Sequence, residues 1–306
     1  MRVKKAVIPA AGWGTRFLPV TKSQPKEMLP LGNKPVIQHS IEEAVACGVD
    51  LVVVVTSAGK SSIENYFDRS LELESVLLQK GDAEMVASLR GLSELADIVF
   101  VRQREQLGLG HAVLTASKVI GEEPFLLILP DDLFEQPASV LPQMVEVYQE
   151  FGGSVLSIKQ VSDEEVSRYG IIASRQIAPR THQVYDMVEK PSVADAPSHL
   201  AIMGRYLLTP EIFRKLNEVT RGVNGEYQLT DGLKMLLDNQ SVYACEFDGA
   251  RYDAGTPLGW LEASITIAMK DPDLGPGLRQ FLYHNIAGML GADLRQETVL
   301  TSAKSG

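Results

Sequence analysis

The sequence lacks the features that define several large classes of protein. Only two cysteines, Cys47 and Cys245, occur among 306 residues, which is too few for a disulfide framework and indicates a reducing compartment. No apolar run approaches the roughly 20 residues of a membrane span, and the apolar stretch after Lys5 is too short for the core of a signal peptide. We therefore expect a cytoplasmic protein with no membrane partner.

Basic residues are also in the minority. The chain has 29 Lys and Arg against 39 Asp and Glu, which gives a formal net charge of -10. Proteins that bind nucleic acid rely on clustered Lys and Arg, so nucleic acid is not expected as a partner. A single nucleotide needs only a few well-placed cations and a metal ion, so the charge does not exclude an enzyme that acts on nucleotides.

Internal repeats and low-complexity linkers are absent too. Apolar residues make up 45% of the chain and charged residues 22%, which is ordinary for a globular protein with one large core. We expect a single domain over residues 1–283 and a C-terminal tail over 284–306. Within that tail, Ser302 to Gly306 are expected to be disordered.

Short apolar runs alternate with segments of helical period. The expected strands are Ala6–Ile8, Leu51–Val55, Ile98–Val101, Phe125–Leu129, Ser154–Gln160, Gly170–Ala173, Val184–Val188 and Ala201–Leu208. The expected helices are Pro35–Ala46, Ala83–Leu95, His111–Ile120, Thr209–Asn217, Thr230–Asn239 and Leu258–Lys270. Runs that are apolar on both faces suit a sheet covered by helices on both sides. The order predicts an α/β fold with an open, mostly parallel sheet, which the second half of the chain extends.

A glycine-rich turn follows the first expected strand, between Pro9 and Phe17. Small residues in such a turn let backbone N–H groups approach phosphate oxygens closely. The turn also stands at the carboxyl end of a strand, where open α/β sheets bind their ligands. Arg16, Lys22 and Lys26 would add positive charge nearby.

Two well-known phosphate-binding motifs do not fit this chain. The dinucleotide fingerprint needs a third glycine where Phe17 stands, which disfavours a nicotinamide oxidoreductase. A P-loop ending in Gly59-Lys60-Ser61 needs an earlier glycine where Val54 stands. Judged by itself, the glycine-rich turn is interpreted equally well as an ordinary tight turn.

A longer string with fixed internal spacing decides between these interpretations. It runs Ala10-Ala11-Gly12-x-Gly14-Thr15-Arg16-x-Leu18-Pro19 and then Thr21-Lys22-x-x-Pro25-Lys26-Glu27-Met28-Leu29-Pro30. The string resembles the signature of the sugar nucleotidyltransferases, in the form found in bacterial UTP–glucose-1-phosphate uridylyltransferases. The resemblance continues to about Leu282. It implies a Rossmann-like fold of the nucleotide-diphospho-sugar transferase type, with residues 1–283 as the catalytic domain, and assembly as a homodimer or homotetramer.

The resemblance also implies where UTP binds. In the family a Gln and a Gly read the pyrimidine base, and these match Gln103 and Gly108. A Gln side chain offers both a donor and an acceptor, which suits the imide edge of a pyrimidine. The implied nucleotide-binding residues are Ala10, Ala11, Gly12, Gly14, Thr15, Arg16, Lys26, Gln103 and Gly108.

The metal and the sugar phosphate are assigned in the same way. Asp131 follows the most apolar expected strand, where a carboxylate suits Mg²⁺, a hard cation that prefers oxygen ligands. The resemblance makes Asp131 and Asp253 the metal ligands and disfavours Asp132. The residues implied for the sugar phosphate are Gly170, Glu189, Lys190 and Gly204.

Together these residues imply one reaction. An oxygen of glucose 1-phosphate attacks the α-phosphorus of UTP in line, giving UDP-glucose and pyrophosphate without a covalent intermediate. Catalysis of this kind depends on positioning and charge stabilisation. The catalytic residues would be Arg16, Lys26, Asp131 and Lys190.

Two alternatives within this fold stay open. A thymidylyltransferase would use dTTP, which differs from a uridine nucleotide at the base by one methyl group, and pockets discriminate a methyl group only modestly. A catalytically silent regulator that binds nucleotide sugars is disfavoured, because it has no chemical need for all the charged residues named above. Trp13 is a bulky residue inside the Gly-x-Gly turn and is the main departure from the family pattern.

Overall fold

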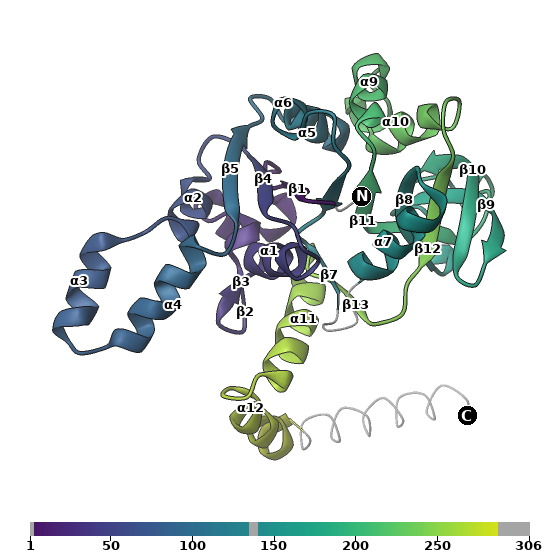
Figure 1. The fold of residues 1–306 in the computed structure, drawn as a ribbon. Helices are drawn as coiled ribbons and strands as arrows, with labels where there is room; N and C mark the ends of the chain where they lie inside the picture. The colour runs from purple at the N-terminus through teal and green to yellow at the C-terminus, as the bar shows by residue number, and fades with distance from the viewer. Residues whose placement is uncertain (1–2, 135–139, 287–306) are drawn as a thin grey trace, which may run out of the picture.

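One nine-stranded sheet runs through both halves of the chain in the computed structural model, which describes residues 3–134 and 140–286 (Figure 1). Its strands lie in the order β5 (Asp97–Arg102), β4 (Leu51–Thr56), β1 (Lys5–Pro9), β6 (Phe125–Ile128), β11 (Leu200–Leu208), β8 (Ser154–Gln160), β12 (Val242–Glu246), β10 (Thr181–Glu189) and β9 (Gly170–Ala178). The second half of the chain therefore extends the sheet that the first half begins, as predicted.

The sheet is parallel at one end and mixed at the other. Strand β1 pairs in parallel with β4 and β6, and β4 pairs in parallel with β5. From β11 onward most pairings are antiparallel, and β9 and β10 form a hairpin whose turn contains Arg180 at φ 58°. The predicted α/β class with helices on both faces is confirmed. The sheet is mixed and not mostly parallel as expected, because β11 lies between β6 and β8 and runs antiparallel to both, and β9 and β10 form a hairpin.

Alternating side chains bury both faces of the central strands. On β1, Ala6 and Ile8 face one core and Val7 faces the other. The first face is covered by α1 (Val36–Ala46), α2 (Ser61–Phe67) and α7 (Val140–Phe151). The second is covered by α5 (Leu109–Thr115), α6 (Ser117–Ile120), α9 (Glu211–Glu218) and α10 (Leu229–Leu236). This double burial explains why the central strands read as continuous apolar runs.

Strand β5 departs from that pattern. Its residues alternate between exposed and half-buried, and Val99 is 37% exposed. The run Ile98–Val101 had predicted a strand covered on both faces, which is wrong because β5 lies at the edge of the sheet. An edge strand has a neighbour on one side only, and the sequence run does not reveal this.

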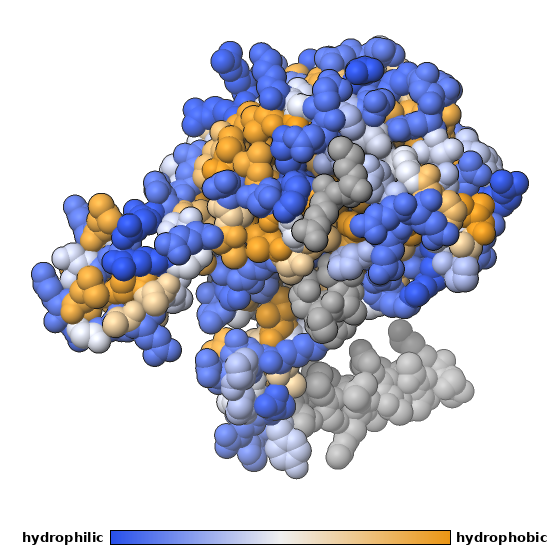
Figure 2. Space-filling model, viewed as in Figure 1, coloured by the Kyte–Doolittle hydropathy of each residue, from blue (hydrophilic) through white to orange (hydrophobic). Residues whose placement is uncertain are grey.

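Two helices, α3 (Leu71–Gln79) and α4 (Ala83–Ser93), form a hairpin that stands away from the body (Figure 1). Apolar side chains on it remain exposed, including Leu71 and Leu78, and Figure 2 shows hydrophobic residues along the hairpin. The prediction for α4 is confirmed to within two residues, whereas α3 was not predicted. Glu74 is buried between Arg69 and Arg90, with N–O distances of 2.6 and 2.8 Å, and this ion-pair cluster joins the two helices.

A small second sheet lies beside the main one. Strand β7 (Asp132–Phe134) pairs antiparallel with β13 (Arg251–Asp253), and α11 (Pro257–Lys270) and α12 (Gly275–Phe281) follow. Helix α11 begins where predicted, because Thr256 caps it by accepting from the Gly259 amide at 3.2 Å. The remaining short elements are η1 (Thr15–Phe17), η2 (Val20–Lys22), η3 (Lys26–Met28), β2 (Pro30–Leu31), β3 (Lys34–Pro35), α8 (Asp163–Val166), η4 (Val223–Gly225) and η5 (Leu282–Ile286).

The C-terminal prediction is only partly covered by the structure. The turn of π-helix η5 spans the expected boundary between residues 283 and 284. Residues 302–306, which were expected to be disordered, lie outside the described residues. Every helix within 3–134 and 140–286 is too short or too polar to cross a membrane.

Candidate active site

Two adjoining pockets open at the carboxyl ends of the parallel strands β1 and β6. The smaller pocket has a volume of about 400 Å³ and is lined by the glycine-rich turn, η3 and the start of α5. The larger pocket has a volume of about 650 Å³ and is lined by residues from β7, β9, β10, β11 and β13. Leu109, Leu129 and Asp131 line both pockets, so the two form one continuous site.

The glycine-rich turn forms one wall of the smaller pocket. Gly14 has φ +66°, a left-handed conformation that glycine adopts without strain, and its carbonyl accepts from the Thr21 hydroxyl at 2.8 Å. Gly12 does not have a left-handed backbone, and a Cβ built on it would meet no protein atom within 4 Å. The space above Gly12 is therefore free for a ligand. Trp13 is 69% exposed at the rim of the same pocket.

The structure places most of the predicted nucleotide residues in the smaller pocket, but two lie elsewhere. Those that line it are Ala11, Gly12, Gly14, Thr15, Lys26, Gln103 and Gly108. Ala10 is fully buried beneath the turn, and its amide donates to the Val55 carbonyl at 2.8 Å. Arg16 is exposed and lines the larger pocket, where its guanidinium lies 3.5 Å from the Gly255 carbonyl.

Gln103 occupies the inner end of the smaller pocket and is 3% exposed. Its Nε2 donates to the Gly108 carbonyl at 3.2 Å and lies 2.9 Å from His111 Nδ1. These contacts use the amide nitrogen and orient the side chain, so that its carbonyl oxygen is the group left to meet a ligand. Gly108 has φ +104°, and a Cβ there would lie 2.7 Å from the Glu226 Cβ, so only glycine fits.

Lys26 and Asp131 form an ion pair where the two pockets meet. Lys26 Nζ donates to Asp131 Oδ2 at 2.5 Å, and both side chains are less than one-third exposed. Burial works against both charges, but their mutual attraction outweighs it. The pKa of Lys26 is therefore raised and the pKa of Asp131 is lowered. Both groups are charged at neutral pH.

Glu27 is a site residue that the sequence analysis did not single out. It is 1% exposed, lines the smaller pocket, and accepts from Lys60 Nζ at 2.8 Å through Oε2. Its other oxygen, Oε1, is buried without a hydrogen-bond partner in the described part of the chain. Burial raises the pKa of Glu27 and lowers that of Lys60. An unsatisfied buried oxygen beside a pocket is a site for a ligand's donor.

Asp131 and Asp253 are brought together by the small sheet. Asp253 pairs with Asp132 across β7 and β13, and the Ala254 amide donates to the Asp131 carbonyl at 2.8 Å. A Cβ built on Gly255 would lie 2.9 Å from Asp253 Oδ1 and 3.0 Å from Asp131 Oδ2, so both carboxylates face this glycine. No cluster of three or more metal-ligating side chains occurs among the described residues. Two carboxylates fit a cation that takes its other oxygen ligands from phosphates.

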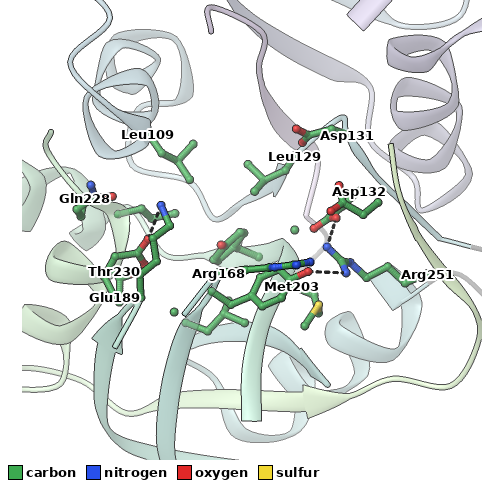
Figure 3. Close-up of a pocket in the computed structure, with 18 of the residues that line it drawn as sticks. Leu109, Leu129, Asp131, Asp132, Arg168, Glu189, Met203, Gln228, Thr230 and Arg251 are labelled. Atoms are coloured by element: carbon green, nitrogen blue, oxygen red, sulfur yellow. Dashed lines mark hydrogen bonds and ion pairs between the residues drawn. The ribbon is translucent and has the colours of Figure 1, made fainter. Parts of the chain in front are cut away.

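Glu189 is the last residue of β10, and Lys190 follows it. Both line the larger pocket, and Glu189 lies across it from Asp132 (Figure 3). Glu189 accepts from the Thr230 hydroxyl at 2.6 Å and lies 3.3 Å from Lys190 Nζ. The helix expected from Thr230 begins one residue earlier, at Leu229, with Gln228 as its N-cap, so Thr230 lies in its first turn and does not cap it. Its hydroxyl instead orients Glu189. Gly170 packs against the side chains of Thr230 and Glu189. A Cβ added to Gly170 would lie 3.0 Å from the Thr230 hydroxyl oxygen and 3.2 Å from Glu189 Oε2.

Gly204 on β11 makes room for Asp132. A Cβ at position 204 would lie 2.7 Å from the Asp132 Cβ, so any larger residue would displace that carboxylate. Asp132 forms an ion pair with Arg251, and Arg251 also contacts the ring of Tyr169. Asp132, Arg251 and Tyr169 all line the larger pocket, and the sequence analysis assigned none of them to the site. Asp132 and Arg251 are 119 residues apart, so no local pattern connects them.

A buried arginine supports the floor of the larger pocket from behind. Arg205 is fully buried and donates to Glu43 at 2.7 Å. Its guanidinium also donates to the carbonyls of Leu129, Gly204 and Asp132 at 2.7 to 2.9 Å. These bonds satisfy the buried charge and hold three neighbouring backbone segments of the site together.

Comparison with known proteins gives this geometry a family. A family model described as nucleotidyl transferase matches residues 5–270. The chain belongs to the nucleotidyl transferase family. The matched range contains every residue of both pockets.

Three similar proteins illustrate the relationship. A UTP–glucose-1-phosphate uridylyltransferase of Staphylococcus epidermidis is 46% identical over 281 residues, which cover 92% of this chain and 98% of that protein. A UTP-bound UGPase from Acinetobacter baumannii is 38% identical with a TM-score of 0.86, and 92% of this chain and 99% of that chain are covered. A UDP-glucose pyrophosphorylase complexed with UDP-glucose is 44% identical with a TM-score of 0.79, over 88% of this chain and all of that one. The predicted family and fold type are confirmed.

Proposed function

We propose that this protein is a UTP–glucose-1-phosphate uridylyltransferase. The reaction would join UTP to glucose 1-phosphate and give UDP-glucose and pyrophosphate. The observation that carries the proposal is the pair of adjoining pockets with Lys26 and Asp131 at their junction, in a chain 46% identical to proteins with this name. The smaller pocket takes the nucleotide and the larger pocket takes the sugar phosphate.

Base selection depends on Gln103. Because its Nε2 is engaged by Gly108 and His111, its carbonyl oxygen is oriented to accept a hydrogen bond. The imide N–H of uracil or thymine can supply that bond, whereas the corresponding ring nitrogen of cytosine is an acceptor. The free Oε1 of Glu27 would accept from a ribose hydroxyl on the same nucleotide.

Asp131 and Asp253 would hold Mg²⁺, which would supply positive charge to neutralise the phosphates of the substrates. Lys26 exchanges Asp131 for the phosphates of the incoming nucleotide, which frees the carboxylate. Arg16, which lines the larger pocket near Gly255, would supply a second positive charge for the departing pyrophosphate. The chain thereby concentrates positive charge where the transition state is most negative.

The sugar phosphate is oriented from the opposite side of the site. Lys190 would bind its phosphate, while Glu189, fixed by the Thr230 hydroxyl, accepts from sugar hydroxyls. Gly170 and Gly204 leave space for the ring, since a Cβ at either position would meet neighbouring side chains. With the phosphate held in this way, one of its oxygens can attack the α-phosphorus in line, and no side chain acts as a nucleophile.

The first experiment measures pyrophosphate release with glucose 1-phosphate and Mg²⁺ while UTP, dTTP, CTP, ATP and GTP are supplied in parallel. We expect clear preference for UTP. A preference for dTTP would move the protein to the thymidylyltransferases and preserve the site assignment. If folded protein released no pyrophosphate with any of the five, the proposal would be wrong and the silent regulator would be favoured.

Location and assembly complete the proposal. Both cysteines are free thiols, in keeping with a cytoplasmic protein. We propose a homodimer or homotetramer, and size-exclusion chromatography with light scattering at several protein concentrations decides between them. A monomer at all concentrations would contradict this part of the proposal alone.

A further inference from the structure

Arg251 connects two walls of the larger pocket that come from distant parts of the chain. Its Nη2 donates to Asp132 Oδ1, and its Nη1 donates to the Tyr169 hydroxyl at 3.2 Å. The centre of the guanidinium also lies 5.2 Å from the centre of the Tyr169 ring, which is within cation–π range. The Arg251 side chain is only 12% exposed, so water screens these contacts little. Figure 3 shows Arg251 and Asp132 on the same side of the pocket.

The two partners of Arg251 are each next to a residue with a proposed role. Asp132 follows Asp131, and Tyr169 precedes Gly170. Arg251 itself lies two residues before Asp253 on β13. One side chain therefore fixes the segment that carries a proposed metal ligand relative to the segment that borders the sugar. Neither Arg251 nor its two partners line the smaller pocket.

Asp132 is held over Gly204 by the same contact. The absent side chain of Gly204 leaves the space that the Asp132 carboxylate fills, and Arg251 neutralises that carboxylate. Without the guanidinium, the Asp132 carboxylate would be left buried without its ion-pair partner and would no longer be held in this position. The geometry thus explains how the chain keeps two adjacent aspartates in two different roles.

We propose that Arg251 is a positioning residue for the sugar phosphate. It acts through Asp132 and Tyr169, which it holds at the correct separation on the wall of the larger pocket. This inference rests on the proposed function, since it takes the larger pocket to be the sugar-phosphate pocket. Because no contact of Arg251 reaches the smaller pocket, its loss should affect sugar-phosphate binding and leave nucleotide binding unchanged.

The test compares Arg251→Ala, Arg251→Lys and Tyr169→Phe with the unmodified enzyme. We expect Arg251→Ala to raise the KM for glucose 1-phosphate by about tenfold or more, while the KM for UTP stays within about twofold. Added guanidinium ion should restore much of the lost affinity in Arg251→Ala, since it can occupy the vacated space. Arg251→Lys and Tyr169→Phe, which each keep part of the contact set, should give smaller increases in the same KM.

Arg90→Ala is the matched control, because Arg90 also pairs with a buried carboxylate but lies on α4, which contributes nothing to either pocket. It should leave both KM values unchanged. Nucleotide binding is followed by the fluorescence of Trp13 in a Trp260→Phe background, and folding by the Tm. If Arg251→Ala does not fold, the other two variants decide the test.

Equal changes in both KM values, no change in either, or no response to guanidinium would overturn the positioning role. If the proposed function were wrong, the unmodified protein itself would form no UDP-glucose, which distinguishes that failure from failure of the positioning role. Active unmodified enzyme together with an Arg251→Ala variant of normal kinetics would refute this inference alone.

Discussion

Lys26 and Asp131 are 105 residues apart in sequence, yet Nζ of the lysine donates to Oδ2 of the aspartate at 2.5 Å. The contact joins η3, next to the glycine-rich turn, to the end of β6, and it lies where the two pockets meet. In the ligand-free protein the lysine neutralises the carboxylate that we propose for Mg²⁺. When a triphosphate binds, Lys26 would pair with its phosphates, and the Asp131 carboxylate would become available to hold the metal.

Asp131→Asn tests the proposed metal ligand. The amide keeps the shape of the carboxylate but loses its charge, so we expect kcat at saturating Mg²⁺ to fall by about 100-fold or more while the protein stays folded. Turnover is measured by pyrophosphate release and folding by circular dichroism. Asp186→Asn is the control, because Asp186 pairs with Lys234 outside both pockets and should retain full activity. Near-normal turnover of Asp131→Asn would remove Asp131 from the mechanism.

Lys190 allows a test that separates binding from stability. Its backbone has φ +46°, which costs a side-chain-bearing residue about 1 kcal/mol or more, whereas glycine adopts this conformation freely. Lys190→Gly removes the cation and this strain together. We expect the KM for glucose 1-phosphate to rise more than the KM for UTP, while the free energy of unfolding changes by no more than about 1 kcal/mol. A larger rise in the KM for UTP would contradict the assignment of Lys190.

Gly108→Ala tests the close approach beside Gln103. An added Cβ would lie 2.7 Å from the Glu226 Cβ and 2.9 Å from the Tyr227 carbonyl, so the loop must move. We expect the KM for UTP to rise by about tenfold or more. Gly121→Ala is matched for strain, since its φ is +69°, but its added Cβ meets nothing within 4 Å. Gly121→Ala should lose some stability and keep its KM for UTP. If the KM for UTP rose equally in both variants, backbone strain and not the close approach at Gly108 would be responsible.

His39 predicts a dependence of stability on pH. Burial lowers the pKa of its imidazole. Its Nε2 lies 3.4 Å from the Leu31 carbonyl oxygen, and a neutral ring with its proton on Nε2 can donate a hydrogen bond to that oxygen. The unfolded chain takes up the proton at about pH 6.5, before the folded protein does, so stability is lost as the pH falls below that value. Urea unfolding at about pH 7.5 and about pH 5.5 should show a smaller loss for His39→Gln than for the unmodified protein. Identical losses would show that His39 does not contribute.

Much of the fold follows from local patterns. The run at Val52 to Val55 predicts a buried strand because residues on both faces are apolar, and Gly48 predicts the end of α1, where its φ of +94° is indeed found. Helix α3 was not predicted, because its apolar residues do not form the single buried stripe that marks an amphipathic helix. Leu71 and Leu78 are both exposed. Whether a strand lies at the edge of the sheet, as β5 does, depends on neighbours that the strand itself does not encode.

The glycine-rich turn and the family string were enough to locate the smaller pocket, because their residues are contiguous. They were not enough to show that Ala10 lies beneath the turn or that Arg16 reaches the larger pocket. Glu27 lies within the string, but the string does not indicate its role. The structure shows that Lys60 bonds to one of its carboxylate oxygens and that the other, Oε1, has no partner within the described residues.

Residues that are neighbours along the chain were sufficient to predict the class of fold, the glycine-rich turn and the family. The tertiary structure decided which charges meet. It paired Lys26 with Asp131 and Arg251 with Asp132, and so gave two adjacent aspartates different partners. The physical reason is that an ion pair requires contact within a few ångströms in a buried setting. Such contacts between residues more than 100 positions apart are set by strand order, register and burial, which no local pattern specifies.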